Sequence, residues 1–248
     1  MGLPRGEDER AVMAYYETHW HDRMTDRATK AADWALLAAA GGVAGKDVVD
    51  LGCGYPHDAL RWVGEARSWT LVDWCLLALT KALAVVLQEG ILLHTALADI
   101  RALREEWQAS FDMVLCFGTL TLIPTGRDRV HAEAFRILRP GGGYLLTVPD
   151  QTHFGFAERS GPEVCGYMAT WTPEQLGEEL RAAGFVVREL QGDTGARLSA
   201  WAEKPWGQPE ASPLPLLPPE PPVDIPSSGA VPPPAQAPDR SRHGRRRR

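Results

Sequence analysis

Aspartates close two apolar runs in the first third of the chain. The run Asp47–Leu51 carries Asp50 and passes directly into Gly52-Cys-Gly54. The run Trp69–Asp73 ends in the second aspartate. Two glycines in three residues let the backbone turn tightly and approach a ligand closely, because no Cβ atom intervenes. Since ligands bind beyond the carboxyl ends of strands in open α/β sheets, these residues are the first candidates for a ligand site. The alternative is that each acid only caps a turn.

The glycine turn continues through Tyr55 and Pro56 to His57. The dinucleotide fingerprint G-x-G-x-x-G needs a glycine at the position of His57, so a nicotinamide oxidoreductase is the weaker interpretation. His57 follows the turn closely enough to approach a bound ligand; the alternative is a first-turn helix residue that faces solvent. The acids and histidines of the chain lack the close spacing of metal ligands, so no metal site is expected.

The elements that must position these residues alternate along the chain. Short, continuous apolar runs suit strands buried on both faces of a parallel sheet. Besides the two runs above, the expected strands are Leu92–Leu97, Phe111–Phe117, Tyr144–Val148, Phe185–Leu190 and Arg197–Ala202. The expected helices between them cover Leu76–Leu87, Ile100–Trp107, Val130–Leu138 and a segment capped by Thr172 that ends at Gly184. This order predicts an α/β fold with a doubly wound, mostly parallel, seven-stranded sheet.

Prolines divide the chain into two parts. Thirteen of the 20 prolines lie between Pro205 and Pro238, and the chain closes on the run Arg245–Arg248. Proline runs cannot continue a helix or donate ladder hydrogen bonds, so residues 206–248 are expected to form a disordered tail. Residues 1–205 are expected to form the folded domain, with residues 1–45 as an N-terminal helical lid region.

Charge and composition narrow the choice of partners. The six arginines and four acids of residues 206–248 leave 20 basic and 28 acidic residues in the rest of the chain, a net charge of about −8. An acidic body disfavours nucleic acid as a partner. No segment has the roughly 20 apolar residues of a membrane span, and four scattered cysteines fit a reducing cytoplasm. The tail suits an acidic or SH3-like partner; the alternative is a solvated end without a function.

Between Asp47 and Leu190 the sequence resembles the class I S-adenosylmethionine (SAM)-dependent methyltransferases. Val48-Val-Asp-Leu-Gly-Cys-Gly54 is similar to the first motif of that family, and Arg136-Ile-Leu-Arg-Pro-Gly-Gly142 is similar to its "RVLKPGG" turn. The fourth strand, Phe111–Phe117, and the pair Trp171-Thr-Pro-Glu-Gln-Leu and Ala183-Gly-Phe185 follow in the family's order. The resemblance implies a Rossmann-like methyltransferase fold and SAM as the cofactor.

The resemblance also implies roles for individual residues. The turn at Gly52 and Gly54, with Asp50, would hold the methionine part of SAM, and Asp73 would accept hydrogen bonds from both ribose hydroxyls. Asp99 would read the adenine amino group beside an apolar contact from Ile100; the alternative is that Asp99 caps a helix. Trp74 and Phe117 complete the expected cofactor site.

Two departures from the family pattern leave the mechanism open. Pro56 replaces the usual third glycine, and Leu122 replaces the histidine of the L-x-H-x-P pattern found in many small-molecule enzymes. A hydroxyl or amine acceptor needs a proton sink, for which the candidates are His57 and, in the N-terminal segment, Tyr16 and His19. These two share helical spacing and are expected to belong to a lid; the alternative is a helix packed on the sheet.

The sequence therefore predicts an enzyme that transfers a methyl group from SAM to an oxygen or nitrogen nucleophile of a small molecule. The alternative is a non-catalytic SAM-binding protein that recruits partners through its Pro/Arg-rich tail.

Overall fold

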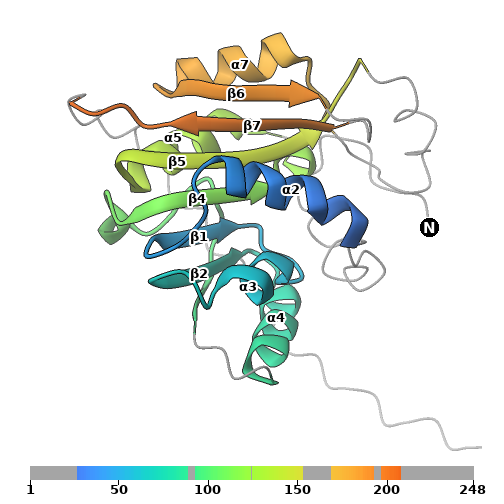
Figure 1. The fold of residues 1–248 in the computed structure, drawn as a ribbon, viewed down its shortest axis with the longest axis vertical. Helices are drawn as coiled ribbons and strands as arrows, with labels where there is room; N and C mark the ends of the chain where they lie inside the picture. Colours follow the sequence, from blue (N-terminus) through green and yellow to red (C-terminus); the bar gives the residue numbers. More distant parts are fainter. Residues whose placement is uncertain (1–26, 89–92, 124, 153–168, 193–196, 208–248) are drawn as a thin grey trace, which may run out of the picture. The chain divides into compact units, whose positions relative to one another are not determined.

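The seven expected strands are present and form one sheet in the order β3-β2-β1-β4-β5-β7-β6 (Figure 1). The computed structural model describes residues 27–88, 93–123, 125–152, 169–192 and 197–207. β7 is antiparallel to β5 and β6, and the other neighbours are parallel. The strands are β1 (Asp47–Leu51), β2 (Ser68–Asp73), β3 (His94–Leu97), β4 (Phe111–Phe117), β5 (Leu138–Pro149), β6 (Val186–Gly192) and β7 (Arg197–Glu203). This confirms the doubly wound, mostly parallel, seven-stranded sheet.

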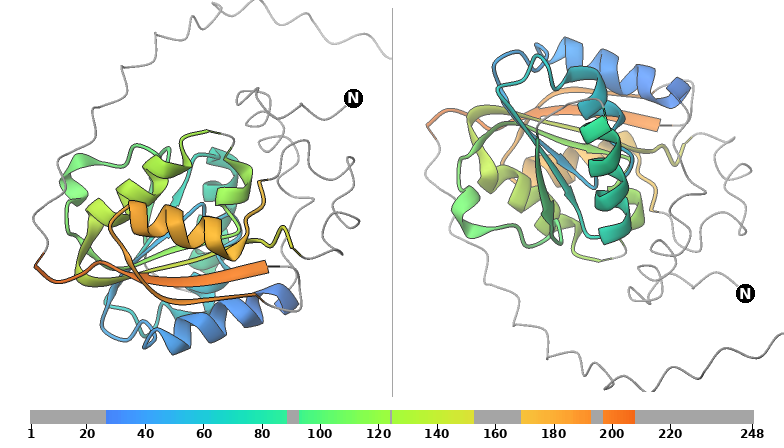
Figure 2. Two further views of the ribbon diagram at one scale, coloured as in Figure 1. Left: turned by 90° about the horizontal axis from the view of Figure 1, so that it is seen from above. Right: turned by 90° about the horizontal axis from the view of Figure 1, so that it is seen from below.

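Helices cover both faces of this sheet (Figures 1 and 2). On one face lie α2 (Arg27–Ala39), α3 (His57–Trp62) and α4 (Leu76–Gln88), and on the other α5 (Arg127–Ile137) and α7 (Pro173–Ala182). Two 3-10 helices, η2 (Glu105–Trp107) and η3 (Leu120–Leu122), lie in the connections. In β5, Tyr144 and Leu146 pack in the core under α5 and α7, whereas Leu145 packs in the core under α2. A strand covered on both faces needs a continuous apolar run.

Local sequence signals fix helix α7. Thr172 accepts a hydrogen bond from the Gln175 N–H while the Gln175 side chain accepts one from the Thr172 N–H, and Pro173 opens the first turn. Gly184 follows the last turn with φ +95°, a conformation that favours glycine. The predicted start and end of this helix are confirmed.

Three local predictions are wrong. Ile100–Trp107 forms a turn and η2 rather than a helix, because side chains of α5 bind the backbone groups of residues 103–105. His94, expected inside a buried strand, is exposed because β3 is an edge strand. The helix expected to reach Leu138 ends at Ile137, and Leu138 begins β5.

Several predicted features lie outside the described residues, among them most of the tail and the N-terminal residues Tyr16 and His19. Their division into domain, lid and tail stays a prediction. Of the helices that the structure describes, none combines the length and the hydropathy of a membrane-spanning helix.

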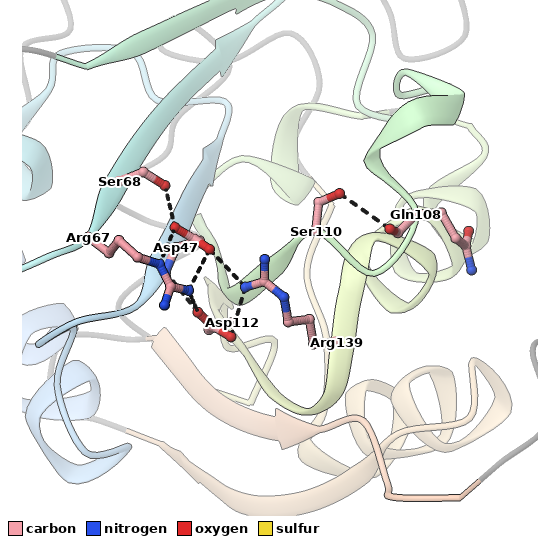
Figure 3. A network of polar contacts seen from close by, with 7 residues as sticks. All are labelled: Asp47, Arg67, Ser68, Gln108, Ser110, Asp112 and Arg139. Carbon is pink, nitrogen blue, oxygen red and sulfur yellow. Dashed lines mark hydrogen bonds and ion pairs between the residues drawn. The ribbon is translucent and has the colours of Figure 1, made fainter.

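An ionic network joins the amino ends of β1, β4 and β5 (Figure 3). These are the strand ends opposite the glycine turn, which follows the carboxyl end of β1. Asp47 accepts hydrogen bonds from Arg67 Nε at 2.9 Å, from Ser68 Oγ at 2.7 Å and from Arg139 Nη1 at 2.9 Å. Asp112 pairs with the same two arginines and accepts the Asp47 N–H at 2.9 Å. The hydrogen bond from Arg67, with those from Ser68 and Arg139, holds the pKa of Asp47 well below its usual range against the opposing effect of burial.

We expect Asp47→Asn to lower the free energy of unfolding at neutral pH by about 1–3 kcal/mol, because hydrogen bonds to a charged group are lost. The depressed pKa stabilises the fold above the unfolded value of about 3.9, and this stabilisation is lost as the pH falls towards the folded value. Asp47→Asn should therefore show a shallower loss of stability below about pH 4. Denaturant unfolding over this pH range measures both effects.

Glu178→Gln is the matched control, because Glu178 is an exposed carboxylate on α7. Its removal should leave stability within about 0.5 kcal/mol of the unaltered chain. Equal stabilities of Asp47→Asn and Glu178→Gln at neutral pH would contradict the role given to the network.

Candidate functional site

The first glycine turn folds back onto the carboxyl end of β2. The N–H groups of Gly52 and Cys53 both donate to the Val72 carbonyl, at 2.8 and 3.0 Å. The Gly54 N–H then donates to Asp73 Oδ2 at 3.0 Å, and the Cys75 N–H donates to Asp73 Oδ1 at 2.9 Å. Asp50, the glycine turn and Asp73 are thus brought to one edge of the sheet, as the sequence predicts.

Steric contact explains why the turn begins with glycine. Gly52 has φ +72°, and a Cβ atom there would lie 2.2 Å from Thr119 Cγ2. Thr119, which follows β4, also donates its hydroxyl to the Gly52 carbonyl at 3.2 Å. Thr119 could not be predicted from the sequence, because the pattern of the first motif contains no information about the residue that packs against it.

The Asp73 carboxylate is held ready to accept further hydrogen bonds. Its residue is only 5% exposed, and this burial raises the pKa of Asp73, while the hydrogen bonds from the Cys75, Gly54 and Trp74 backbone lower it in part. An ionised carboxylate has about four acceptor positions, and a buried one gains from every added donor. A ligand that donates hydroxyl groups here would supply that stabilisation.

Asp50 lies in β1, just before the glycine turn that begins at Gly52. It is 3% exposed in β1 and pairs in register with Leu115 of β4. Burial, with the charges of Asp73 and Asp50, raises the pKa of the Cys53 thiol well above its usual value. Burial raises the pKa of Cys116 to about 12. Both thiols stay protonated at neutral pH, and both side chains belong to the hydrophobic core.

The third strand brings Asp99 to the same edge. Leu97 pairs in register with Asp73, and the Ala98 N–H donates to the Asp73 carbonyl at 3.1 Å. The Asp99 side chain is 44% exposed and accepts hydrogen bonds from the N–H and the guanidinium of Arg101. Burial raises the pKa of Asp99, but these hydrogen bonds and the Arg101 charge bring it below its usual value. Asp99 therefore stabilises a turn, not the helix expected, and its carboxylate remains partly accessible.

The other predicted site residues surround this edge. Trp74 is half-buried directly after Asp73, and Phe117 is half-buried at the end of β4. The side chain of Ile100 is only 5% exposed and packs in the core. His57 is half-buried as the first residue of α3, with its ring 4.4 Å from the Tyr55 ring. It is thus a first-turn helix residue, as in the alternative, and its role at a bound ligand stays a prediction.

Pro56 takes the N-cap position of α3 without a side-chain hydrogen bond to the helix. The short helix is instead fixed from α2, where Trp34 Nε1 donates to Asp58 Oδ1 at 2.9 Å. The departure at Pro56 thus leaves the glycine turn and its hydrogen bond to Asp73 intact. Leu122, the residue in place of a histidine, lies in η3.

Residues 169–171 bind the chain next to the carboxyl ends of β4 and β5. The Ala169 N–H donates to the Thr121 carbonyl at 3.0 Å, and the Trp171 N–H donates to the Pro149 carbonyl at 3.1 Å. Trp171 is held in turn by Glu179, whose Oε2 accepts the indole N–H at 2.9 Å.

Within the residues described here, no group of histidines, cysteines and acids could hold a metal ion.

Comparison with known proteins agrees with this geometry. Residues 48–142 match the family model described as "Methyltransferase domain". Over 163 residues the chain is 26% identical to the ubiquinone biosynthesis O-methyltransferase of Pseudomonas fluorescens, covering 62% of this chain and 70% of the relative.

Solved structures share the fold. A Burkholderia thailandensis 1,6-didemethyltoxoflavin N1-methyltransferase with bound S-adenosylhomocysteine superposes with a TM-score of 0.65 and 22% identity, over 83% of this chain and 92% of that one. The [4+2]-cyclase SpnF superposes with a TM-score of 0.66 and 18% identity, over 82% and 98%. The cyclase shows that the fold alone does not fix the reaction. The match to the methyltransferase family model and the methyltransferase relatives support a class I SAM-dependent methyltransferase, and the solved structures show its fold.

Proposed function

We propose that this enzyme transfers the methyl group of SAM to an oxygen or nitrogen nucleophile of a small-molecule acceptor. The observation that carries the proposal is the buried Asp73 carboxylate, clamped by the Gly54 and Cys75 N–H groups at the carboxyl edge of the sheet. Asp73 accepts hydrogen bonds from the two ribose hydroxyls of SAM. The turn at Gly52 and Gly54, next to Asp50, receives the methionine part.

The adenine lies on the side of β3 in this proposal. The exposed part of the Asp99 carboxylate accepts a hydrogen bond from the adenine amino group, and Ile100, which packs mostly in the core, contributes beside it only the 5% of its surface that is exposed. Trp74 and Phe117, both half-buried at strand ends, supply further apolar surface. The raised pKa of Asp73 fits a group that gains donors on binding.

The bound sulfonium supplies an electrophilic methyl group. The protein then has to align the acceptor in line with that methyl group and exclude water from it. A hydroxyl or amine acceptor also has to lose a proton. We assign this step to His57, whose ring lies at the end of the glycine turn, and we keep Tyr16 and His19, outside the described residues, as the other candidates.

Two observations support a small molecule as the acceptor, and a third supports a place in the cytoplasm. The named relatives are a ubiquinone biosynthesis O-methyltransferase and a didemethyltoxoflavin N1-methyltransferase. The body of the chain carries a net charge of about −8, which repels nucleic acid. Free, buried thiols at Cys53, Cys75 and Cys116 fit work in the reducing cytoplasm.

We expect Asp73→Asn to weaken SAM binding by about 10- to 100-fold, because the asparagine amide has one acceptor oxygen and no charge. Calorimetric titration with SAM measures the change. The matched control is Asp128→Asn, since Asp128 is an exposed carboxylate in the first turn of α5. The control should bind SAM like the unaltered chain. A folded Asp73→Asn variant with unchanged affinity would show that the assigned cofactor position is wrong.

We also expect a labelled methyl group of SAM to enter the small-molecule fraction when the purified chain is incubated with a cell extract. Chromatography of protein, nucleic-acid and small-molecule fractions locates the label. Asp73→Asn at a SAM concentration below its dissociation constant is the control and should transfer about tenfold less. Label found only in protein or nucleic acid would contradict a small-molecule acceptor and leave the cofactor assignment standing.

A further inference from the structure

Residues 103–105, which follow β3, form hydrogen bonds with side chains of helix α5. Glu133 Oε2 accepts the Leu103 N–H at 2.7 Å. Arg136 donates through Nη2 to the carbonyls of Leu103 and Arg104, at 3.3 and 3.1 Å, and through Nη1 to the Glu105 carbonyl at 3.3 Å. One carboxylate and one guanidinium thus fix the backbone of three consecutive residues.

These two side chains also hold each other. Arg136 Nε donates to Glu133 Oε1 at 2.9 Å, and Arg136 Nη2 donates to Glu133 Oε2 at 2.8 Å. Both are largely buried, with side-chain exposures of 18% for Glu133 and 20% for Arg136. A planar guanidinium with five donors can pair with a carboxylate and reach several carbonyls at once.

Helix α5 is itself well fixed. Val130, Ala134 and Ile137 are fully buried against the sheet. At its carboxyl end, the buried Lys204 donates to the carbonyls of Phe135 and Leu138 at 2.9 and 2.8 Å. The residues just before α5 contact the same segment, because Arg101 Nη1 donates to the Thr125 carbonyl at 3.4 Å.

Along the chain, Asp99 lies between β3, which pairs with β2 and Asp73, and residues 103–105, which α5 holds. The N–H of its neighbour Ala98 donates to the Asp73 carbonyl, and Arg101, which pairs with the Asp99 carboxylate, donates to the Thr125 carbonyl just before α5. Free loops after a strand sample many conformations, whereas this one is tied at both ends. A shift of the 103–105 backbone would move Asp99 relative to Asp73.

We infer that Glu133 and Arg136 are positioning residues for cofactor recognition: by holding residues 103–105 against α5, they place Asp99 at the adenine of SAM. This inference rests on the proposed function and adds to it the groups that set adenine selectivity from a distance. Neither residue touches the cofactor in this account.

The test uses the full chain with two ligands. S-adenosylhomocysteine carries the adenine amino group, and S-inosylhomocysteine has a carbonyl oxygen in its place. We expect the unaltered chain to bind the inosine ligand about 10- to 100-fold more weakly, because the donor to Asp99 is lost.

Glu133→Gln should reduce that selectivity. A glutamine oxygen can accept from Leu103 or from Arg136, but its NH₂ group repels the other donor. We expect the variant to bind S-adenosylhomocysteine about tenfold more weakly and S-inosylhomocysteine within about twofold of the unaltered chain. Asp128→Asn, on the same helix, should change neither. If Glu133→Gln does not fold, Arg136→Lys, which cannot span three carbonyls, should show the same loss of selectivity.

Equal weakening of both ligands, with a lower melting temperature, would show a merely structural role and overturn the inference. Unchanged selectivity in a folded variant would overturn it as well. No binding of S-adenosylhomocysteine by the unaltered chain would contradict the proposed function first, and the inference with it.

Discussion

The hydrogen bond from the Gly54 N–H to the Asp73 carboxylate joins the two strands on which the site depends. It exists because Gly52 reverses the chain at a positive φ under Thr119, and because the next two N–H groups close onto the end of β2. A buried carboxylate without donors would cost several kcal/mol. Backbone N–H groups meet part of that cost here and leave acceptor capacity directed to a ligand.

The charged residues at the two ends of the strands have different roles. At the amino ends of β1, β4 and β5, paired aspartates and arginines neutralise one another and hold the strands in register. At the carboxyl ends, Asp50 and Asp73 are buried, and the Asp73 carboxylate accepts the backbone N–H groups of Gly54 and Cys75. Charge that is paired stabilises the sheet; charge that is held by N–H groups is available for recognition.

The presence of the seven strands, the glycine turn after β1 and the start and end of α7 could be predicted because they depend on local signals: apolar runs, Gly52, Thr172 and Gly184. The failed helix at Ile100–Trp107 shows where such signals end. Its backbone groups bind Glu133 and Arg136, about 30 residues away in the chain, so tertiary contacts outweigh local propensity. Thr119 escaped notice for the same reason, since its importance arises only from contact with Gly52.

The match of residues 48–142 to the methyltransferase family model supports the class of enzyme, while the proposed position of the cofactor on this chain depends on Asp73. A crystal structure of the full chain with S-adenosylhomocysteine tests that position most directly. The account predicts both ribose hydroxyls within about 2.5–3.0 Å of the Asp73 carboxylate oxygens, with the adenine amino group towards Asp99. A complex in which the ribose lies elsewhere, and Asp73 bonds only to its own turn, would contradict it.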